Sequence, residues 1–456
     1  MIKFKKINSA VDCNVLVGLA ICLIFYFVLC FSFGVQICAD SKGYIEMVSA
    51  REPVYPLFLA FMRWVFGEAE YLNAVIVIQN LLMAVSVWLI TAYLKKECQL
   101  NVFTYYVLIL SNFAVALLCQ FVAKRGSIYS NSILTEGIAI PLWLILILTI
   151  WKGINTDRLM YVICIFILCA VMMDIRKQMA VGYIVAMLAL FIHYVGKMGF
   201  WRKMVRALSI AIISLVLAVL FTRGYNYLLR GSFAQNTRDM NLVLTTSLYV
   251  ADEDDGRLIE EDNVRELFNN TYEKLTMLKA NYSYAGDKWY ELSDHYEESY
   301  DKITIDTTAD DFVDFAVEKG FASGMEAEKE ADRMSSVIVK SLLGDNISKY
   351  IEVYEASLLE GLVNTVAKKS PKLNGIAALM YVIYTALCFI CIKNKETRYI
   401  GIMGAVVLIS CLVNAGVIAA LIFCQTRYMI YNMALFYMML VVMLAKTIAF
   451  AYKKKC

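Results

Sequence analysis

Long apolar runs alternate with short polar stretches along most of the 456-residue chain. Each run has roughly 20 residues, the length of helix that crosses a hydrocarbon core of about 30 Å. We expect ten membrane-spanning helices, at 13–36, 72–94, 102–122, 132–151, 159–174, 178–195, 204–223, 373–392, 399–423 and 429–450. The pattern predicts an all-α polytopic membrane protein. The first run, Val15 to Val35, is longer than the apolar part of a signal peptide, so we expect a retained helix.

Basic residues lie mainly in alternate loops between these runs. If the N-terminus is cytoplasmic, the inside loops carry 17 Lys and Arg residues and the short outside loops carry 8. This bias follows the positive-inside rule. It predicts a multi-pass protein of the cell membrane with both termini in the cytoplasm.

One polar segment, residues 224–372, interrupts the apolar pattern. Between Asp252 and Arg333 it holds 24 acidic residues and 9 basic ones. Apolar positions within it recur at helical spacing, for example along 347–359. We therefore expect three parts: an N-terminal transmembrane module (1–223), a mostly helical, acidic extracytoplasmic domain (224–372) and a C-terminal transmembrane module (373–456).

Composition supports the membrane assignment. The chain is 60% hydrophobic, against about 45–50% apolar residues in soluble domains. Its net charge of +3 gives no reason to expect a nucleic-acid partner. The chain has 13 cysteines, but segment 224–372 has none, which argues against a disulfide framework.

The first outside loop, residues 37–71, has an unusual composition. It begins with an acid, Asp40, and holds Pro53 and Pro56, two of the four prolines in the chain. The stretch that follows, "PVYPLFLAFMRWVFG", is too short to span a membrane and suits a juxtamembrane helix in the interface. We expect Tyr55 and Trp64 to lie at headgroup level.

Further polar residues gather at the outside ends of the expected spans. They are Lys124, Arg125, Glu136, Asp174, Arg176, Lys177, Gln178, Arg427 and Tyr428. Charges at membrane depth normally face a cavity or a partner, and the positive-inside rule disfavours Arg and Lys on this side. One explanation is an anionic ligand in the outer leaflet, because Arg and Lys bind phosphate. The alternative is that these cations only reach headgroups or pair with Asp174 and Glu136.

Several of these stretches together resemble the GT-C superfamily of membrane glycosyltransferases, which includes protein O-mannosyltransferases and lipid A aminoarabinose transferases. "ADSKGY" followed by "REPVYPLFLAF" is similar to the family's acidic first loop and its proline step into a juxtamembrane helix. "LTEGIAIPLW", "MDIRKQMAVGY" and "QTRYMIYNMALFYMML" resemble a Thr-Glu element, an Arg-containing turn and an Arg-Tyr entry to a late helix. The resemblance covers residues 1–225 and, more loosely, 399–450.

The resemblance implies an inverting enzyme that takes a sugar from a polyprenyl-phosphate or polyprenyl-diphosphate donor on the outer face. Asp40 matches the catalytic base, and Arg176 and Arg427 match residues that hold the donor phosphate, with Lys177 assisting. Glu136, Arg125, Tyr44 and Tyr428 are candidates for further substrate contacts, although Glu136 also suits a structural ion pair. The acceptor, whether glycan, lipid or protein, stays open.

One departure from the family concerns metal. Many relatives carry two adjacent acids in the first loop, whereas Ser41 follows Asp40 here. This departure argues against a divalent metal site without excluding one, and we expect no other cofactor.

Three other classes of function remain as alternatives. They are a transporter or flippase for lipid-linked glycans, an O-antigen-type polymerase or ligase, and a non-enzymatic assembly protein. A transporter typically carries ionisable residues near the midplane and an internal repeat, whereas this sequence has few charges within its spans and no repeat. A polymerase or ligase of this type lacks the early acid and proline loop, and an assembly protein leaves the outer-face cations unexplained.

Overall fold

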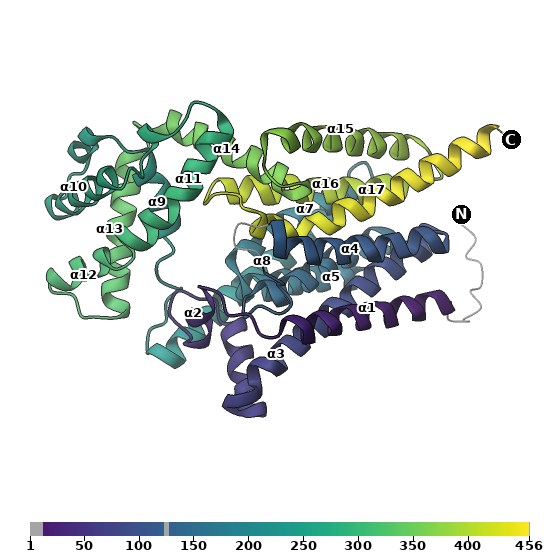
Figure 1. Ribbon diagram of the computed structural model, residues 1–456, viewed down its shortest axis with the longest axis horizontal. Coiled ribbons are helices and arrows are strands. Elements are labelled where there is room, and N and C mark those ends of the chain that lie inside the picture. Colours follow the sequence, from purple (N-terminus) through teal and green to yellow (C-terminus); the bar gives the residue numbers. More distant parts are fainter. Residues whose placement is uncertain (1–11, 123–126, 456) are drawn as a thin grey trace.

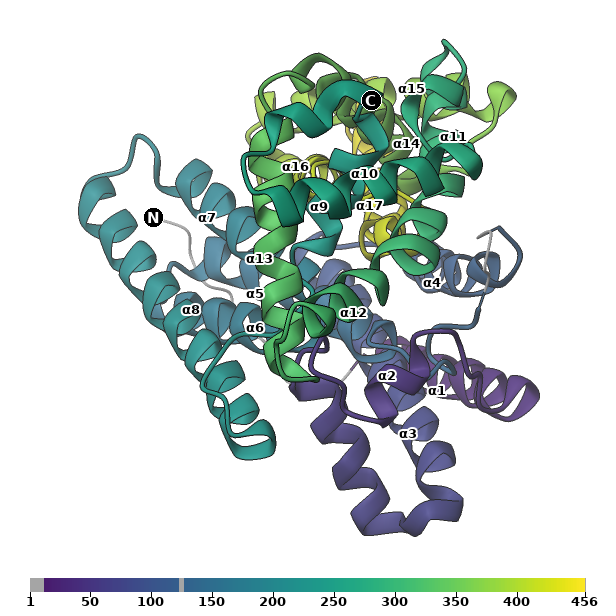
Figure 2. The same cartoon turned by 90° about the vertical axis from the view of Figure 1, so that its left-hand side faces the viewer.

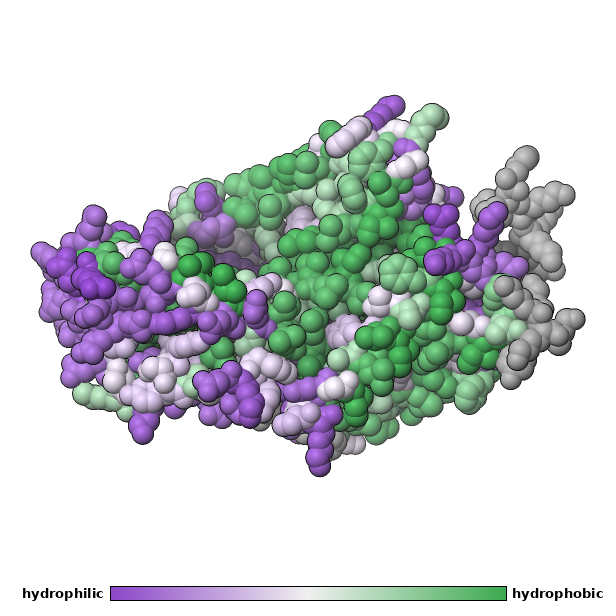
Figure 3. All heavy atoms as spheres, turned by 90° about the horizontal axis from the view of Figure 1, so that it is seen from above, coloured by the Kyte–Doolittle hydropathy of each residue, from purple (hydrophilic) through white to green (hydrophobic). Residues whose placement is uncertain are grey.

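The computed structural model describes residues 12–122 and 127–455, and these residues contain helices but no strands. A bundle of long apolar helices occupies one end of the molecule and a domain of shorter helices occupies the other (Figure 1). An apolar surface covers the bundle between two polar ends (Figure 3). The molecule thus has the surface expected of a multi-pass membrane protein.

The bundle is formed by helices from both ends of the sequence. They are α1 (Cys13–Phe33), α3 (Val54–Glu97), α4 (Val102–Val122), α5 (Glu136–Thr156), α6 (Leu159–Ile175), α7 (Val181–Tyr194), α8 (Phe200–Arg230), α15 (Pro371–Lys393), α16 (Arg398–Ala419) and α17 (Thr426–Lys455). Within the described residues, nine helical segments are long and apolar enough to cross a membrane. Helix α6, with 17 residues, is the one expected span that is not among these nine. It falls at the lower limit for spanning.

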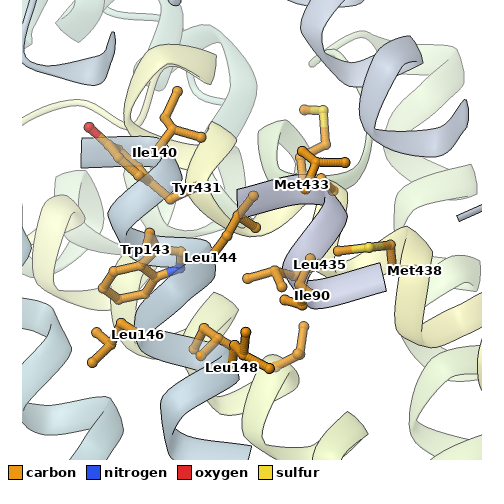
Figure 4. Packing of buried hydrophobic residues seen from close by; sticks show 14 of the residues in the cluster. Ile90, Ile140, Trp143, Leu144, Leu146, Leu148, Tyr431, Met433, Leu435 and Met438 are labelled. Atoms are coloured by element: carbon orange, nitrogen blue, oxygen red, sulfur yellow. The ribbon is translucent and has the colours of Figure 1, made fainter. Parts of the chain in front are cut away.

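Helix α5 lies at the centre of the bundle. Its apolar window is 83% buried, more than that of any other candidate span in the described chain. It packs against α3 and α6, and its Trp143 lies near Tyr431 of α17 in the core (Figure 4). Trp143 donates a hydrogen bond from Nε1 to Oδ1 of Asn432 at 3.0 Å, which satisfies a buried indole. The residue at the outer end of α5 is Glu136.

The polar domain consists of helices from the middle of the chain. They are α9 (Asn241–Val250), α10 (Asp262–Met277), α11 (Trp289–Ile303), α12 (Asp311–Glu318), α13 (Met325–Leu342) and α14 (Ile347–Val366), with short helical turns η2 (Glu253–Leu258), η3 (Tyr282–Tyr284) and η4 (Thr304–Thr308). This domain has its own apolar core, which includes Tyr249, Phe268 and Tyr296. Helix α14 packs against both α11 and the bundle helices α16 and α17. The domain is therefore joined to one end of the bundle.

The first and last helices of the chain have their free ends at the end of the molecule opposite the polar domain. Helix α1 begins there and α17 ends there (Figure 1). The ends of the spans at which the polar residues gather in the sequence therefore lie beside the polar domain.

The expected juxtamembrane helix forms the first part of α3. Gly67 interrupts the helix with φ 75° and ψ 167°, a conformation that glycine adopts without steric cost. The two arms of α3 that meet there are seen at the lower edge of Figure 2. Phe61 and Trp64 are exposed on the first arm, in line with an interfacial helix. The expectation for Tyr55 was wrong, because this residue is fully buried and donates its hydroxyl to Gln79 at 3.0 Å.

Candidate functional site

A short backbone pairing brings the first outside loop beside the start of α5. After α1 the chain turns at Gly34, and Gln36 forms an isolated bridge with Ser132. Ser41, the first residue of the short helix α2 (Ser41–Ile45), donates its hydroxyl to the carbonyl of Ile133 at 2.9 Å. These bonds hold Asp40, which precedes α2, close to Glu136.

Five charged side chains form a chain of alternating sign at this end of the bundle. Asp40 accepts from Arg51 through Oδ1 at 2.9 Å and from Arg427 through Oδ2 at 2.8 Å. Glu136 pairs with Nε of Arg427 and with Nη1 of Arg176, the latter at 2.5 Å. Sequence positions that are hundreds of residues apart thus meet in one ionic network.

The network is closed at one end and open at the other. Glu136 is fully buried, and the side chains of Arg176 and Arg427 are 13% and 19% exposed. Asp40 and Arg51 are about a third exposed. A ligand can therefore reach the network from the side of Asp40, while the buried Glu136 holds Arg176 and Arg427 in place.

The network carries one positive charge in excess, because three arginines face two carboxylates. A fully buried carboxylate needs such partners, since leaving it unpaired costs several kcal/mol. The surplus guanidinium charge favours an anion, and arginine binds phosphate in a planar, two-pronged geometry. The arrangement is thus suited to a phosphate group that approaches beside Asp40.

The pKa of Asp40 reflects the same surroundings. Burial alone would raise it, but Arg427 and Arg51 together outweigh burial and hold it well below its ordinary value. In this state Asp40 is ionised at neutral pH and is a weak proton acceptor.

Neighbouring side chains fix the orientation of Arg176. Its guanidinium lies 5.2 Å from the ring centroid of Tyr428, and its Nε donates to Gln178 at 3.0 Å. Gln178 in turn donates to the carbonyl oxygen of Tyr428 at 3.0 Å. Tyr428 therefore supports a network arginine through its ring and its backbone.

Two other sequence-predicted residues take supporting or separate positions. Tyr44 is buried beneath the guanidinium of Arg51, at 4.7 Å from its carbon to the ring centroid. Lys177, at the start of the turn η1 (Lys177–Ala180), forms an ion pair with Asp239 instead of joining the network. Arg125 lies outside the described residues.

Sequence reasoning gave Arg51 no role, although it contacts Asp40 directly. One signal for it was present, because an arginine in an outside loop departs from the positive-inside bias. Its position two residues before Pro53 also places it in the loop that holds Asp40.

A small cavity of about 30 Å³ lies one helical turn inward from the network. Its lining includes Tyr431, four residues after Arg427 on α17, and Ile140, four residues after Glu136 on α5. Tyr26, Tyr129 and Tyr431 line it, and each has a buried hydroxyl without a hydrogen-bond partner. The rest of its lining is mostly apolar.

The comparisons with known proteins add no family name. No protein-family model, curated protein or solved structure matches this chain. The assignment of a function therefore depends on the site itself and on the resemblance seen in the sequence.

A metal-binding cluster is not seen in the part of the chain that the structure describes. Residues 12–122 and 127–455 contain no group of three or more His, Cys, Asp or Glu side chains placed to hold a metal ion. The acids of the site bind arginines instead.

Proposed function

We propose that the protein is a glycosyltransferase of the GT-C type that transfers a sugar from a polyprenyl-phosphate donor to an acceptor at the extracytoplasmic face. The observation that carries this proposal is the 2.8 Å contact between Asp40 and Arg427, which places a carboxylate next to an excess of guanidinium charge. Transfer of a phosphosugar needs both: a base for the acceptor and cations for the departing phosphate.

The charge balance favours a donor with one phosphate. A sugar phosphodiester carries one negative charge, which equals the surplus of the network formed by Arg51, Arg176, Arg427, Asp40 and Glu136. A diphosphate brings a second negative charge beside the buried Glu136. Uncompensated charge in a partly buried site is unfavourable, so the monophosphate is the better match.

The location of the site supports a lipid-linked donor. The network lies where the apolar bundle meets the polar domain, so a polyprenyl chain can remain in the apolar region while its phosphate reaches Arg427. An acceptor can approach from the aqueous side, toward Asp40. In this proposal the polar domain is extracytoplasmic and both termini are cytoplasmic.

The chemical step uses these residues in fixed roles. Asp40 accepts the proton of an acceptor hydroxyl, whose oxygen attacks the anomeric carbon of the donor sugar. The bond from that carbon to the phosphate oxygen breaks, and its electron pair stays on the phosphate. Arg427 and Arg176 stabilise the new charge, a contribution often worth several kcal/mol in a site shielded from water. The products are an inverted glycoside and the polyprenyl phosphate, and Asp40 returns its proton to solvent.

The test is a transfer assay on membranes that contain the full-length protein. Labelled polyprenyl-phosphate sugars are added, and transfer is compared between wild type and Asp40→Asn. We expect the substitution to reduce transfer by about 10²–10⁴-fold, the usual contribution of a general base. Glu46→Gln is a matched control, because Glu46 is a half-exposed acid at the end of the same short helix.

Two results would count against the proposal. Transfer that persists in Asp40→Asn would remove the assigned base. Movement of a labelled lipid across the membrane, with no sugar transferred, would favour a flippase instead.

A further inference from the structure

Each carboxylate oxygen of Asp40 has its own arginine partner. Oδ1 accepts from Nη2 of Arg51 at 2.9 Å, and Oδ2 accepts from Nη1 of Arg427 at 2.8 Å. The two arginines differ in everything else that they contact. This difference suggests different tasks.

Arg427 is shared between the two acids. It also binds Glu136 through Nε and, at 3.4 Å, through Nη2. If a donor phosphate binds Arg427, it competes with Asp40 for the Nη1 group. Glu136 is fully buried and keeps its hold on the rest of the guanidinium.

Among the described residues, Arg51 pairs with Asp40 and forms no ion pair with Glu136, and it is supported from a different side. Its guanidinium lies over the ring of Tyr44 at 4.7 Å. Tyr44 packs edge-on against Tyr55 at 5.3 Å between ring centroids, and the Tyr55 hydroxyl donates to Gln79. Both tyrosines are buried, so Arg51 rests on a rigid aromatic base.

We propose that Arg51 is a positioning residue that keeps Asp40 in place when the donor phosphate draws Arg427 away from it. This inference rests on the proposed function and extends it. The donor binds first and releases Oδ2 of Asp40, which then accepts the proton of the acceptor hydroxyl. Oδ1 stays bound to Arg51, so the freed oxygen remains correctly oriented.

Binding of the donor before Asp40 acts as a base has a physical benefit. While Asp40 is bound by two guanidiniums it is a poor base, so water that enters an empty site is not activated. Loss of one guanidinium contact raises the proton affinity of the carboxylate. Binding of the donor phosphate therefore activates the base, and Asp40 stays a poor base in a site without phosphate.

The charged groups around Asp40 determine its pKa, and therefore the position of the acid limb in a pH profile of kcat. Arg51 and Arg427 contact it directly, and Glu136 and Arg176 act through Arg427. Tyr44 lies under Arg51, and Glu52 follows Arg51 in the chain. In the donor complex, Arg51 is the one partner expected to remain on Asp40, so the acid limb of kcat depends on it.

The first experiment is a pH profile of kcat for wild type, Arg51→Lys and Arg51→Gln. Removing the positive charge raises the pKa of Asp40, so in Arg51→Gln the acid limb moves to higher pH. Arg51→Lys keeps the charge, and its acid limb stays close to that of wild type. We expect kcat to fall in both, with little change in the KM for the donor. An acid limb that does not move in Arg51→Gln would overturn the proposal, as would a loss confined to the KM for the donor.

The second experiment measures binding of polyprenyl phosphate without a sugar to the purified full-length protein. Because Asp40 competes with phosphate for Arg427, Asp40→Asn should bind this lipid more tightly, on the order of five-fold. Glu46→Gln removes one nearby negative charge without touching Arg427, and its affinity should stay near that of wild type.

The outcomes separate the two proposals. Wild type that does not bind polyprenyl phosphate contradicts the proposed function. Wild type that binds and transfers, with Asp40→Asn no tighter than Glu46→Gln, contradicts the sharing of Arg427 and leaves the glycosyltransferase proposal standing.

Discussion

Asp40 and Arg427 lie 387 residues apart in the chain, yet Oδ2 of one and Nη1 of the other are separated by 2.8 Å. The first residue precedes the short helix α2, and the second lies in the first turn of α17. Their contact closes the bundle at the end beside the polar domain and places the acid and the cation of the proposed reaction together.

Glu136 is expected to be the structural centre of the site. Glu136→Gln removes a fully buried carboxylate from between Arg176 and Arg427, which leaves two partly buried guanidiniums without their shared partner. Breaking buried ion pairs from one side typically costs about 3–5 kcal/mol. Thermal unfolding in detergent should show a large fall in Tm, against almost none for the exposed control Glu46→Gln. An unchanged Tm would show that the arginines find other partners.

Lys177 is expected to contribute little to donor binding. It forms an ion pair with Asp239, is nearly half exposed and has no contact with the network. Lys177→Ala should therefore change the affinity for polyprenyl phosphate less than Arg427→Ala does, and exposed pairs of this kind contribute about 0–1 kcal/mol. If the two variants lost affinity equally, Lys177 would be a phosphate-binding residue, as its sequence position suggested.

The junction between the polar domain and the bundle should respond to pH through Glu360. Burial raises the pKa of Glu360 to about 7, although Lys369, whose Nζ lies 2.7 Å from its Oε1, opposes the shift. A carboxyl with a raised pKa binds its proton more strongly in the folded state. Stability should therefore be highest at low pH and fall as pH rises from about 4.5 toward 7.

Thermal unfolding as a function of pH checks this expectation. In Glu360→Gln the side chain cannot titrate, so Tm should vary less across the same interval. A slope as steep as that of wild type would assign the effect to another group, such as Asp332, whose pKa burial also raises.

The break in α3 should depend on glycine. Gly67 has φ 75° and ψ 167°, a region that is essentially restricted to glycine, so Gly67→Ala should cost about 1–3 kcal/mol. Gly224 in α8 is a matched control, because it lacks a positive φ and has open space around it. Gly224→Ala should be neutral or stabilising by about 0.5–1 kcal/mol. Equal Tm values for the two variants would contradict the role assigned to the break.

The sequence predicted the helical class and most of the spans because the apolar runs are long and well separated. The juxtamembrane helix that ends at Gly67 was also predicted correctly, because a short apolar run after two prolines indicates a separate helical arm. Helix α6 was harder to place, because 17 residues are near the lower limit for a span. Tyr55 was misplaced because an aromatic side chain near a membrane surface can face lipid or protein, and the pattern does not distinguish these.

The sidedness of the spans placed Asp40, Arg176 and Arg427 at one end of the bundle, but their pairing could not be derived. It depends on how loops from distant segments pack, as with Gln36 against Ser132. Arg51 shows the limit most clearly. Its role comes from two contacts, with Asp40 and Tyr44, that no spacing along the chain reveals.

The polar domain also contacts the loop that carries Arg51. Ser49 donates its hydroxyl to Glu328 of α13 at 2.7 Å, two residues before that arginine. Thr237 donates to the same carboxylate at 2.7 Å, so one side chain on α13 secures two loops at once. If the proposed function is right, substitutions in α13 should alter turnover through these loops, and any change of acceptor specificity in that domain would have to preserve them.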